Sequence, residues 1–277
     1  MTAPILDLAL ARRVELAEAH AAVDCAEALE RMRPGGVGAV ERIAGGFAIY
    51  CGAGSPVTQA VGLGLDGAVS EEEFDRLEEF YRSRNEAVRV ETCPLADASL
   101  IRHFGERAYR VTEFSNVMAL PLCESSSAAA ETAGNPPARV TIERIGKQQM
   151  DLWTLTVSQG FSENFLVTQE ILEVMKMFAL GANVECYLAR VDGAVAGGAT
   201  LALRQGVAGL FGASTLPAFR NRGVQTALLK ERLTRAMKEN CDLAVCIAQP
   251  GSSSQRNVVR QGFSVLYTRV KFERAWA

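Results

Sequence analysis

The stretch from Val207 to Asn240 reads VAGLFGAST, LPAF, RNRGVQ, TALLKERLTRAMKEN, and its four parts decide the fold. The first nine residues are apolar or small, as in a buried strand, and LPAF is a turn. After residue 226, apolar residues recur at helical spacing with charged residues between them. The apolar positions are Leu229, Leu233, Ala236 and Met237, and the charged positions are Lys230, Glu231, Arg232, Arg235 and Lys238.

A strand therefore leads into a short loop, at 220–225, that opens a helix. The N–H groups in the first turn of a helix have no partner within the helix, and the helix dipole adds positive potential there. A loop that places Arg220, Arg222 and Gly223 at such a point predicts an anion site. The alternative is an ordinary connection whose arginines are only solvated, because short glycine motifs often occur by chance.

Residues 220–225 resemble the acyl-CoA pyrophosphate loop of the GCN5-related N-acetyltransferases (GNAT), which has the pattern Q/R-x-x-G-x-G/A. Arg220 and Gly223 fit this pattern, whereas Gln225 departs from it. Further along, residues 254–263 (SQRNVVRQGF) resemble the last helix of the family and the Gly-Phe that starts its final strand. The two motifs stand in the order of the family. The resemblance implies an α/β fold with a mixed central sheet flanked by helices.

The composition narrows the class of protein. A chain of 277 residues with 48% hydrophobic and 22% charged residues is ordinary for one large or two smaller globular domains. A net charge of −3 predicts no general affinity for nucleic acid. Residues 1–11 lack the pattern of a signal peptide, and no apolar run approaches 18 residues, so we expect a cytoplasmic protein without a membrane partner.

The cysteines and histidines predict neither disulfides nor a metal. The seven cysteines are an odd number without a C-x-x-C pair, which favours free thiols in a reducing compartment. The two histidines, His20 and His103, are far apart in the sequence. We therefore expect no zinc site and no histidine-based catalytic triad.

Residues 123–138 separate the chain into two predicted domains, at 1–122 and 139–277. The segment is rich in Ser, Ala, Gly and Pro and has no periodicity, which indicates an interdomain linker. A long surface loop within one domain is the alternative. Helices are expected at 12–33, 70–84, 97–105, 148–159, 167–179, 226–240 and 253–261, and strands at 46–50, 59–65, 88–92, 114–120, 139–143, 184–191, 195–204, 207–215, 243–248 and 265–274.

An internal repeat relates the two predicted domains. Residues 74–94 parallel residues 227–250, each as a helix followed by a strand. In the first copy Glu71, Glu72 and Glu73 stand at the helix start, where they would repel a pyrophosphate. We therefore expect two tandem acyl-CoA N-acyltransferase (GNAT-like) domains, of which the N-terminal one is degenerate and has lost the cofactor.

The resemblance also implies where acetyl-CoA binds. Backbone N–H groups of the loop would contact the pyrophosphate, and the side chains of Arg220 and Arg222 would add charge. The preceding strand would pair with the pantetheine arm, and one of its N–H groups would polarise the thioester carbonyl. The alternative for Gly212 and Ala213 is that they only ease packing. The implied cofactor residues are Phe211, Gly212, Ala213, Ser214, Thr215, Arg220, Arg222, Gly223, Val224, Gln225, Thr226 and Asn257, the last of which is alternatively a plain helix-surface residue.

The family pattern does not assign the general acid and the general base in this sequence. The family commonly has a Tyr acid four residues before the Gly of Gly-Phe, but Val258 stands there. Tyr267 is a possible substitute, with an ordinary sheet tyrosine as the alternative. Glu163 and Glu170 are the available carboxylate bases, and a base acting through one water is equally allowed. Phe161, Phe165, Trp153 and Met175 either line an acceptor pocket or belong to the core.

We therefore expect an acetyl-CoA-dependent N-acetyltransferase that acts on an amine of a small molecule by direct attack in a ternary complex. It would be a monomer or homodimer. Two rival functions remain open. The family's Tyr is missing at Val258, and the Glu that many members carry on the strand before the loop is replaced by Ser214 and Thr215. Both departures favour a non-catalytic CoA-binding or sensor protein. A tandem scaffold also suits an aminoacyl- or peptidyl-type transferase, which would need a basic face for RNA.

Overall fold

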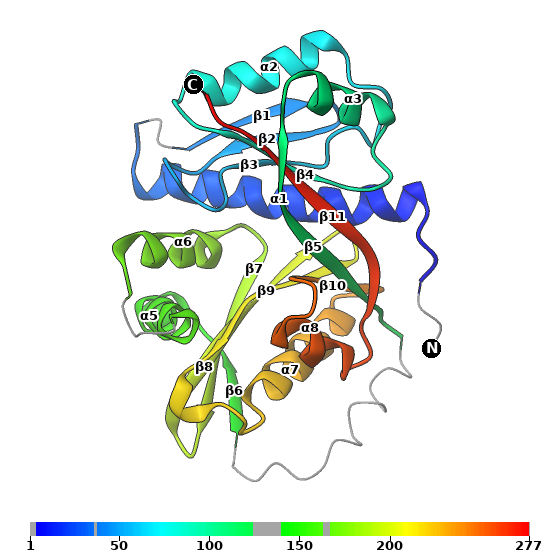
Figure 1. Cartoon of the computed structure of the whole chain (residues 1–277). Helices are drawn as coiled ribbons and strands as arrows, with labels where there is room; N and C mark the ends of the chain where they lie inside the picture. Colours follow the sequence, from blue (N-terminus) through cyan, green and yellow to red (C-terminus); the bar gives the residue numbers. More distant parts are fainter. Residues whose placement is uncertain (1–3, 36–37, 124–139, 163–166, 277) are drawn as a thin grey trace. The chain divides into compact units, whose positions relative to one another are not determined.

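The structure is a computed structural model that describes residues 4–35, 38–123, 140–162 and 167–276. The chain divides into two compact units (Figure 1). The first contains residues 1–118, 247–259 and 263–277, and the second contains residues 119–246 and 260–262. Apart from Cys123, the predicted linker lies outside the described residues. The predicted domains at 1–122 and 139–277 remain a prediction. The compact units differ from them by placing residues 247–259 and 263–277 with the N-terminal residues, and residues 119–122 with the second unit.

The first unit is built on a mixed sheet in the order β1-β2-β3-β4-β11-β5. Strands β3 and β4 are parallel, with Ala60 opposite Val90, whereas β4 and β11 are antiparallel, with Phe272 opposite Val90. Its strands are β1 (Ala39–Ile43), β2 (Gly46–Tyr50), β3 (Gln59–Val61), β4 (Val88–Thr92), β5 (Arg110–Pro121, of which the residues up to 118 belong to this unit) and β11 (Ser264–Arg274). Its helices are α1 (Leu8–Met32), α2 (Glu71–Arg82), α3 (Ala98–Glu106) and α8 (Ser253–Val259).

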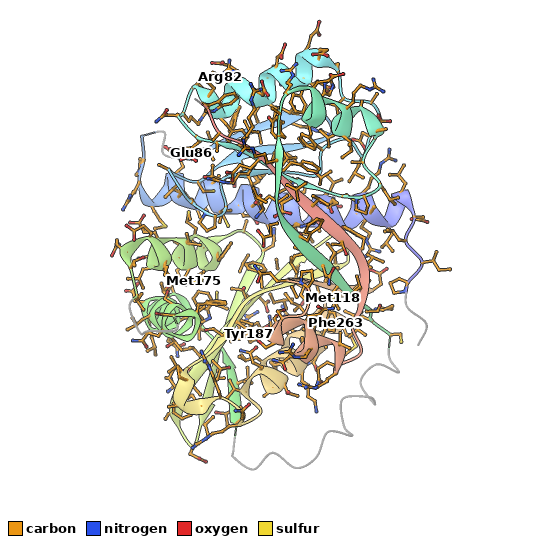
Figure 2. The ribbon with its side chains drawn as sticks, in the orientation of Figure 1. Arg82, Glu86, Met118, Met175, Tyr187 and Phe263 are labelled. Carbon is orange, nitrogen blue, oxygen red and sulfur yellow. The ribbon has the colours of Figure 1, made fainter. Side chains whose placement is uncertain are left out.

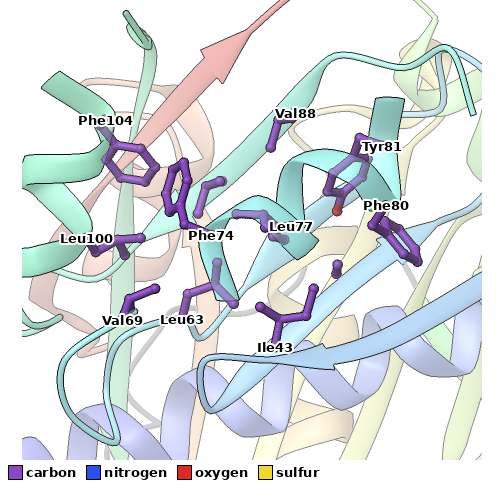
Figure 3. Close-up of a cluster of buried hydrophobic side chains, with 13 residues drawn as sticks. Ile43, Leu63, Val69, Phe74, Leu77, Phe80, Tyr81, Val88, Leu100 and Phe104 are labelled. Carbon is purple, nitrogen blue, oxygen red and sulfur yellow. The ribbon is translucent and has the colours of Figure 1, made fainter. Parts of the chain in front are cut away.

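Helix α2 shows how the core of the first unit forms. Phe74, Leu77 and Tyr81 recur on one face, are at most 1% exposed, and pack into a cluster that also contains Ile43 (Figure 3). The hydroxyl of Tyr81 also bonds to the backbone of Ile49, accepting from its N–H at 3.1 Å and donating to its carbonyl at 3.3 Å. The apolar stripe of α2 thus fixes the helix onto the sheet.

The second unit has a mixed sheet in the order β10-β9-β8-β7-β6. Its strands are antiparallel except for β9 and β10, which run parallel with Val207 opposite Leu243. Its strands are β6 (Val140–Arg144), β7 (Val184–Val191), β8 (Ala194–Arg204), β9 (Val207–Thr215) and β10 (Leu243–Ala248, up to residue 246), and its helices are α5 (Met150–Phe161), α6 (Gln169–Leu180) and α7 (Val224–Lys238), with short 3₁₀ turns at Lys147–Gln149 and Pro217–Phe219.

Helix α5 covers the sheet of the second unit through Trp153. This side chain is fully buried, and its indole N–H donates to the carbonyl of Tyr187 on β7 at 3.1 Å. Tyr187 is labelled in Figure 2. A Cβ at Gly198 would lie 2.8 Å from Val157 and 2.9 Å from the indole nitrogen, so only glycine allows α5 to lie this close to β8. Trp153 therefore belongs to the core.

Each unit contains a β–α–β crossover between parallel strands: β3-α2-β4 in the first and β9-α7-β10 in the second. This is the topological form of the repeat seen in the sequence. Among the described helices, none combines the length and the apolar composition needed to cross a membrane. All seven cysteines are free thiols.

One strand was not predicted, and two predictions about elements were wrong. Strand β1 was not predicted, because charged residues interrupt its short run AVERI. The strand expected at 59–65 ends at Val61, since Gly62 has a φ of +79°, outside the β region. Arg232, expected on the polar face of α7, is 3% exposed, and the buried stripe of this helix instead includes Leu228 and Arg232.

Candidate functional site

Strand β9 contains a β-bulge near its end. Thr200 of β8 lies opposite Phe211, but Gly198 lies opposite Ser214, so β9 has one more residue than β8 between these pairs. Gly212 within the bulge has a φ of +57°, and a Cβ there would lie 2.9 Å from Oγ1 of Thr200. A bulge takes backbone groups out of the sheet ladder and re-aims them. The N–H and C=O groups at 212–213 are thus offered to a ligand.

On the edge opposite β8, the pairing of β9 with β10 ends before β9 does. The parallel register pairs Val207, Ala208 and Gly209 with residues 243–245, while β9 itself continues to Thr215. Among the described residues, no strand pairs with this edge of β9 beyond Gly209, over the same residues that contain the bulge. An open strand edge can pair with another extended chain. This geometry suits a linear amide such as pantetheine.

Helix α7 begins at Gly223 without a side-chain cap. Gly223 has a φ of +79°, and Asn221 before it has a φ of +63°, so the chain makes a left-handed turn into the helix. A Cβ on Gly223 would meet nothing within 4 Å, which leaves open space in front of the first turn. The N–H groups of 224–226 have no intrahelical acceptor. This helix start has the geometry of an anion site.

The first turn of α7 is held to the end of β9. Val224 is 2% exposed, and a Cβ at Gly197 would lie 3.2 Å from its side chain. Gln225 donates from Nε2 to Oγ1 of Thr215 at 2.9 Å. Gln225, which departs from the family pattern, therefore has a local structural partner that joins the bulged strand to the helix start.

The two arginines of the loop lie differently. Arg220 donates to two backbone carbonyls, from Nη2 to Gly160 at 3.3 Å and from Nε to Thr215 at 3.5 Å. Arg222 is exposed, with its guanidinium 5.7 Å from the ring centre of Phe219. Arg220 thus holds the loop in place with its charge nearby, whereas Arg222 can reach an anion.

The side chains at the end of β9 make internal contacts. Ser214 donates from Oγ to the carbonyl of Val157 at 2.9 Å, and the ring of Phe211 lies 5.2 Å from that of Phe178. A Cβ at Gly160 would lie 2.3 Å from Oγ of Ser214, so glycine is needed where α5 meets β9. At Ser214 and Thr215 it is the backbone that remains for a ligand.

It was not predicted from the sequence that Arg232 and Thr200 hold the bulged segment of β9 by hydrogen bonds. Arg232 donates to the carbonyls of Thr200 at 2.9 Å and Leu228 at 3.1 Å, and Oγ1 of Thr200 donates to the carbonyl of Phe211 at 2.5 Å. Burial lowers the pKa of Arg232 to about 10. The four-residue spacing of Leu228 and Arg232 puts both residues on one face of α7, and this was the sequence signal that could have predicted the burial of Arg232.

Residues 151–263 match the model of the Acetyltransferase (GNAT) family. The chain carries a GNAT domain. This segment includes the bulged strand, the loop and α7. Members of this family are acyl-CoA N-acyltransferases. No curated protein matches the sequence.

Solved structures extend the likeness beyond the GNAT domain. A GCN5-related N-acetyltransferase from Kribbella flavida is 14% identical, with 93% of this chain and 96% of that chain covered and a TM-score of 0.64. A tandem GNAT protein from the clavulanic acid biosynthesis pathway is 13% identical, with 94% and 93% covered and a TM-score of 0.61. At such identities the likeness shows the fold. The chain has a tandem GNAT fold, as expected from the sequence.

Tyr267, the expected acid, lies in the first unit and outside the matched segment. Its hydroxyl is buried and donates to Oε1 of Glu15 at 2.7 Å, and Arg269 donates to the same oxygen at 2.8 Å. Burial raises the pKa of Tyr267 far above its usual value. This geometry fits the sheet-tyrosine alternative. The acid role of Tyr267 stays a prediction.

The other predicted residues are only partly placed. Glu163 and Phe165 lie outside the described residues. Glu170 is exposed in the first turn of α6, where the Thr168 hydroxyl lowers the pKa of its carboxyl and weakens it as a base. Asn257 is exposed on α8, which belongs to the first unit, whereas the loop belongs to the second. Its cofactor role stays a prediction.

Proposed function

We propose that this protein is an acetyl-CoA-dependent N-acetyltransferase that acylates an amine of a small molecule. The observation that carries the proposal is the bulged, open-edged end of β9 leading directly into the uncapped start of α7 within the GNAT domain. The two features offer an extended backbone edge and an anion site in sequence. A CoA molecule presents the matching pair, a linear amide arm and a pyrophosphate.

The pyrophosphate would bind at the N–H groups of residues 222–226. Anionic groups at a helix start gain typically about 0.3–1 kcal/mol each from the helix dipole, and more where they are partly buried. Arg222 adds a charged donor from the solvent side. The pantetheine arm would then run along residues 211–215, with its amides on the open edge of β9.

The thioester carbonyl would accept a hydrogen bond from a backbone N–H at the bulge. The amine nitrogen attacks the carbonyl carbon, the C–S bond breaks, and CoA leaves as the thiolate. The proton lost by the amine passes to water. A thiolate needs little help to leave, since the pKa of a thiol is about 8.5. The reaction therefore works without an acid at Val258 and is compatible with a buried Tyr267.

Cofactor binding would be confined to the second unit. The first turn of α2 carries Glu71, Glu72 and Glu73, and Ser70 caps it with Glu73 in a capping box. The first turn of α7 contains no acidic residue. We therefore infer that the N-terminal unit is a degenerate GNAT domain that retains the fold. The free cysteines fit a cytoplasmic protein, and a monomer or homodimer is proposed.

The test is turnover by the full chain with acetyl-CoA and a panel of small amines, read as release of free CoA. We expect saturable release with at least one amine, and an Arg222→Glu variant that loses at least about tenfold in kcat/KM because its carboxylate faces the pyrophosphate. Lys238→Glu, which makes the same charge change in the last turn of α7, is the matched control and should keep the activity.

One rival function has an observation in its favour. Val258 at the usual acid position and the burial of Tyr267 suit a protein that binds CoA without catalysis. Such a sensor would bind CoA and lose affinity in Arg222→Glu, yet release no CoA with any amine. CoA binding combined with a full absence of turnover would replace the enzyme with the sensor.

A further inference from the structure

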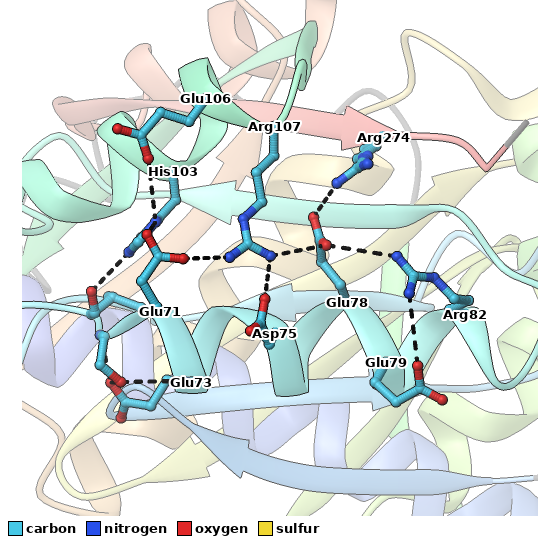
Figure 4. A network of polar contacts seen from close by, with 12 residues as sticks. Glu71, Glu73, Asp75, Glu78, Glu79, Arg82, His103, Glu106, Arg107 and Arg274 are labelled. Atoms are coloured by element: carbon cyan, nitrogen blue, oxygen red, sulfur yellow. Dashed lines mark hydrogen bonds and ion pairs between the residues drawn. The ribbon is translucent and has the colours of Figure 1, made fainter.

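Three side chains of the first unit converge at one end of α2. Glu71 is the first residue of α2, and His103 and Glu106 lie three residues apart on one face of α3 (Figure 4). Nδ1 of His103 is 3.9 Å from Oε1 of Glu71 and 4.0 Å from Oε2 of Glu106. One ligand atom from each residue falls within 4.8 Å of the other two. None of these residues belongs to the proposed CoA site.

The orientation of His103 leaves a lone pair pointing into this group. Nε2 lies 2.9 Å from the carbonyl oxygen of Val69, which can only accept, so Nε2 carries the hydrogen. In the neutral ring Nδ1 is then unprotonated. His103 is 6% exposed, its ring lies 4.8 Å from that of Phe74, and Nδ1 is buried without a hydrogen-bond partner among the described residues. A buried nitrogen of this kind is costly unless something satisfies it.

The two carboxylates that face Nδ1 also only accept. Oε2 of Glu71 accepts from Nη2 of Arg107 at 2.7 Å, which turns Oε1 toward His103. Arg107 also contacts Asp75 and Glu78, so its charge is shared among three carboxylates. Three acceptors thus meet, and no donor from the described residues lies between them. The arrangement calls for a cation at the centre.

We propose that Glu71, His103 and Glu106 bind one zinc ion. An imidazole nitrogen and two carboxylate oxygens form a ligand set that zinc accepts, at about 2.0–2.2 Å each, with water in the fourth position. Calcium and magnesium prefer oxygen ligands alone. The side chains of Glu71 and Glu106 are 68% and 54% exposed, so both can rotate by the small amount needed to close on the ion.

The site has features that support metal ligands elsewhere in proteins. A ligating histidine usually donates its other N–H to a backbone carbonyl, as His103 does to Val69, and a ligating carboxylate is usually held by a second group, as Glu71 is by Arg107. The ion joins the start of α2 to the last turn of α3. Because it binds the folded unit, it would raise the stability of that unit.

No metal site was predicted from the sequence because the only two histidines are far apart along the chain. His103 instead finds its partners in a carboxylate 32 residues earlier and one on the next turn of its own helix. The alternative is that the three side chains are neighbours in the fold and hold no ion. The two alternatives give different results with zinc.

The experiment titrates the full chain with Zn²⁺ in competition with a chromogenic chelator. We expect one ion per chain, and Glu106→Gln should weaken binding at least about tenfold by removing a ligand. Glu72→Gln is the matched control, since it removes an exposed carboxylate next to Glu71 that is not in the site, and its affinity should stay within about twofold of the parent. Zinc should raise the unfolding temperature of the parent and of Glu72→Gln, but not of Glu106→Gln.

The free thiols are the competing ligands, and Cys123 is exposed. Cobalt(II) in place of zinc distinguishes them, because thiolate ligands add an intense charge-transfer band that nitrogen and oxygen ligands lack. A spectrum without that band supports the site. Equal affinity in the parent and Glu106→Gln, a thiolate band, or no binding at a zinc concentration on the order of 0.1 mM would each overturn the proposal.

Discussion

Helices α2 and α7 occupy the same place in the β–α–β crossover of their units but begin in opposite ways. The start of α2 is closed by a capping box from Ser70 and Glu73, and its other first-turn residues are acidic. The start of α7 has a left-handed Gly223, no side-chain cap and no acid. The first turn of α2 is thus capped by its own side chains, whereas the first turn of α7 is not. Under the proposed function, the cap and the acidic residues are what separate a unit that keeps only the fold from one that also binds the cofactor.

The buried arginines of the two units differ in the same sense. Arg269 in the first unit pairs with the carboxylates of Glu15 and Glu18, at 2.8 and 2.6 Å. Arg232 in the second unit is held by the carbonyls of Thr200 and Leu228. In the first unit the buried cation is paired with carboxylates. In the second unit the buried cation is held by neutral carbonyl dipoles, and one of these belongs to Thr200, which lies opposite the bulged strand that would bind the cofactor.

The largest expected effect comes from breaking the buried ion pair. Arg269→Met leaves the carboxylate of Glu15 buried without its cation, so unfolding by urea should show a loss of about 3–5 kcal/mol. Arg232→Met removes hydrogen bonds to neutral carbonyls and should cost about 1–3 kcal/mol. A loss for Arg232→Met equal to or above that for Arg269→Met would contradict the contrast between the units.

The pH dependence of the same variant has a defined sign. Burial raises the pKa of Glu15, and Arg269 opposes that rise, so its removal raises the pKa further. The pKa of this carboxyl in the unfolded chain is about 4.5, and in the folded protein it is higher. Such a group contributes stability at pH values below the unfolded-state pKa. That stability is lost as the pH rises through the folded-state pKa. The deficit of Arg269→Met relative to the parent should therefore shrink as pH falls from 7 toward 5.

The helix starts themselves can be compared with matched charges. Gly223→Glu puts bulk and a negative charge at the start of α7, and calorimetry should show CoA binding at least about tenfold weaker, or about 1.4 kcal/mol. Gly67→Glu places the same residue near α2, at another glycine with positive φ and open space around it. This control should bind CoA as the parent does. Equal losses in both variants would mean that the difference between the starts does not decide binding.

Tyr267 tests whether the chemistry involves the first unit. Tyr267→Phe should leave kcat within about threefold of the parent at pH 7, because the hydroxyl is committed to Glu15. It should also lower the free energy of unfolding by about 1–3 kcal/mol, since a buried carboxylate loses a donor. A fall in kcat on the order of 10²-fold with an unchanged KM for acetyl-CoA would restore Tyr267 as the acid.

The smallest expected effect concerns the cap. Ser70→Ala removes the acceptor for the N–H of Glu73 and should cost about 1 kcal/mol in urea unfolding. Affinity for CoA should not change, because the remaining glutamates still exclude a pyrophosphate. Measurable CoA binding at a second site in this variant would mean that the cap alone had closed the first unit.

Local patterns were enough to predict much of the second unit. Small residues and a loop glycine in 207–223 predicted the strand and the helix start, and the bounds of β7 and β10 follow from runs of apolar and β-branched residues. The bulge at Gly212 was not predicted, because it depends on the register with β8. Helical spacing alone also placed Arg232 on the wrong face, since its acceptor Thr200 comes from another strand.

The parts that sequence reasoning missed rest on contacts between distant residues. Tyr267 and Glu15 are 252 positions apart, and nothing local marks them as a pair. The same holds for His103, whose neighbours Glu71 and Phe74 come from another helix. The pairing of residues 264–274 with β4 is a long-range event as well. Periodicity predicted that these residues form a strand but not which sheet they join.

The position of β11 between β4 and β5 has a consequence for synthesis on the ribosome. Residues 1–118 emerge first, but their sheet is complete only after residue 274 has been made, 156 residues later. At about 5–20 residues per second that interval is roughly 8–30 s. During it, the edges of β4 and β5 are unpaired and open to association with other chains. The earlier-made half of this protein is therefore the later one to mature, and we expect it to depend on chaperones while the GNAT segment is translated.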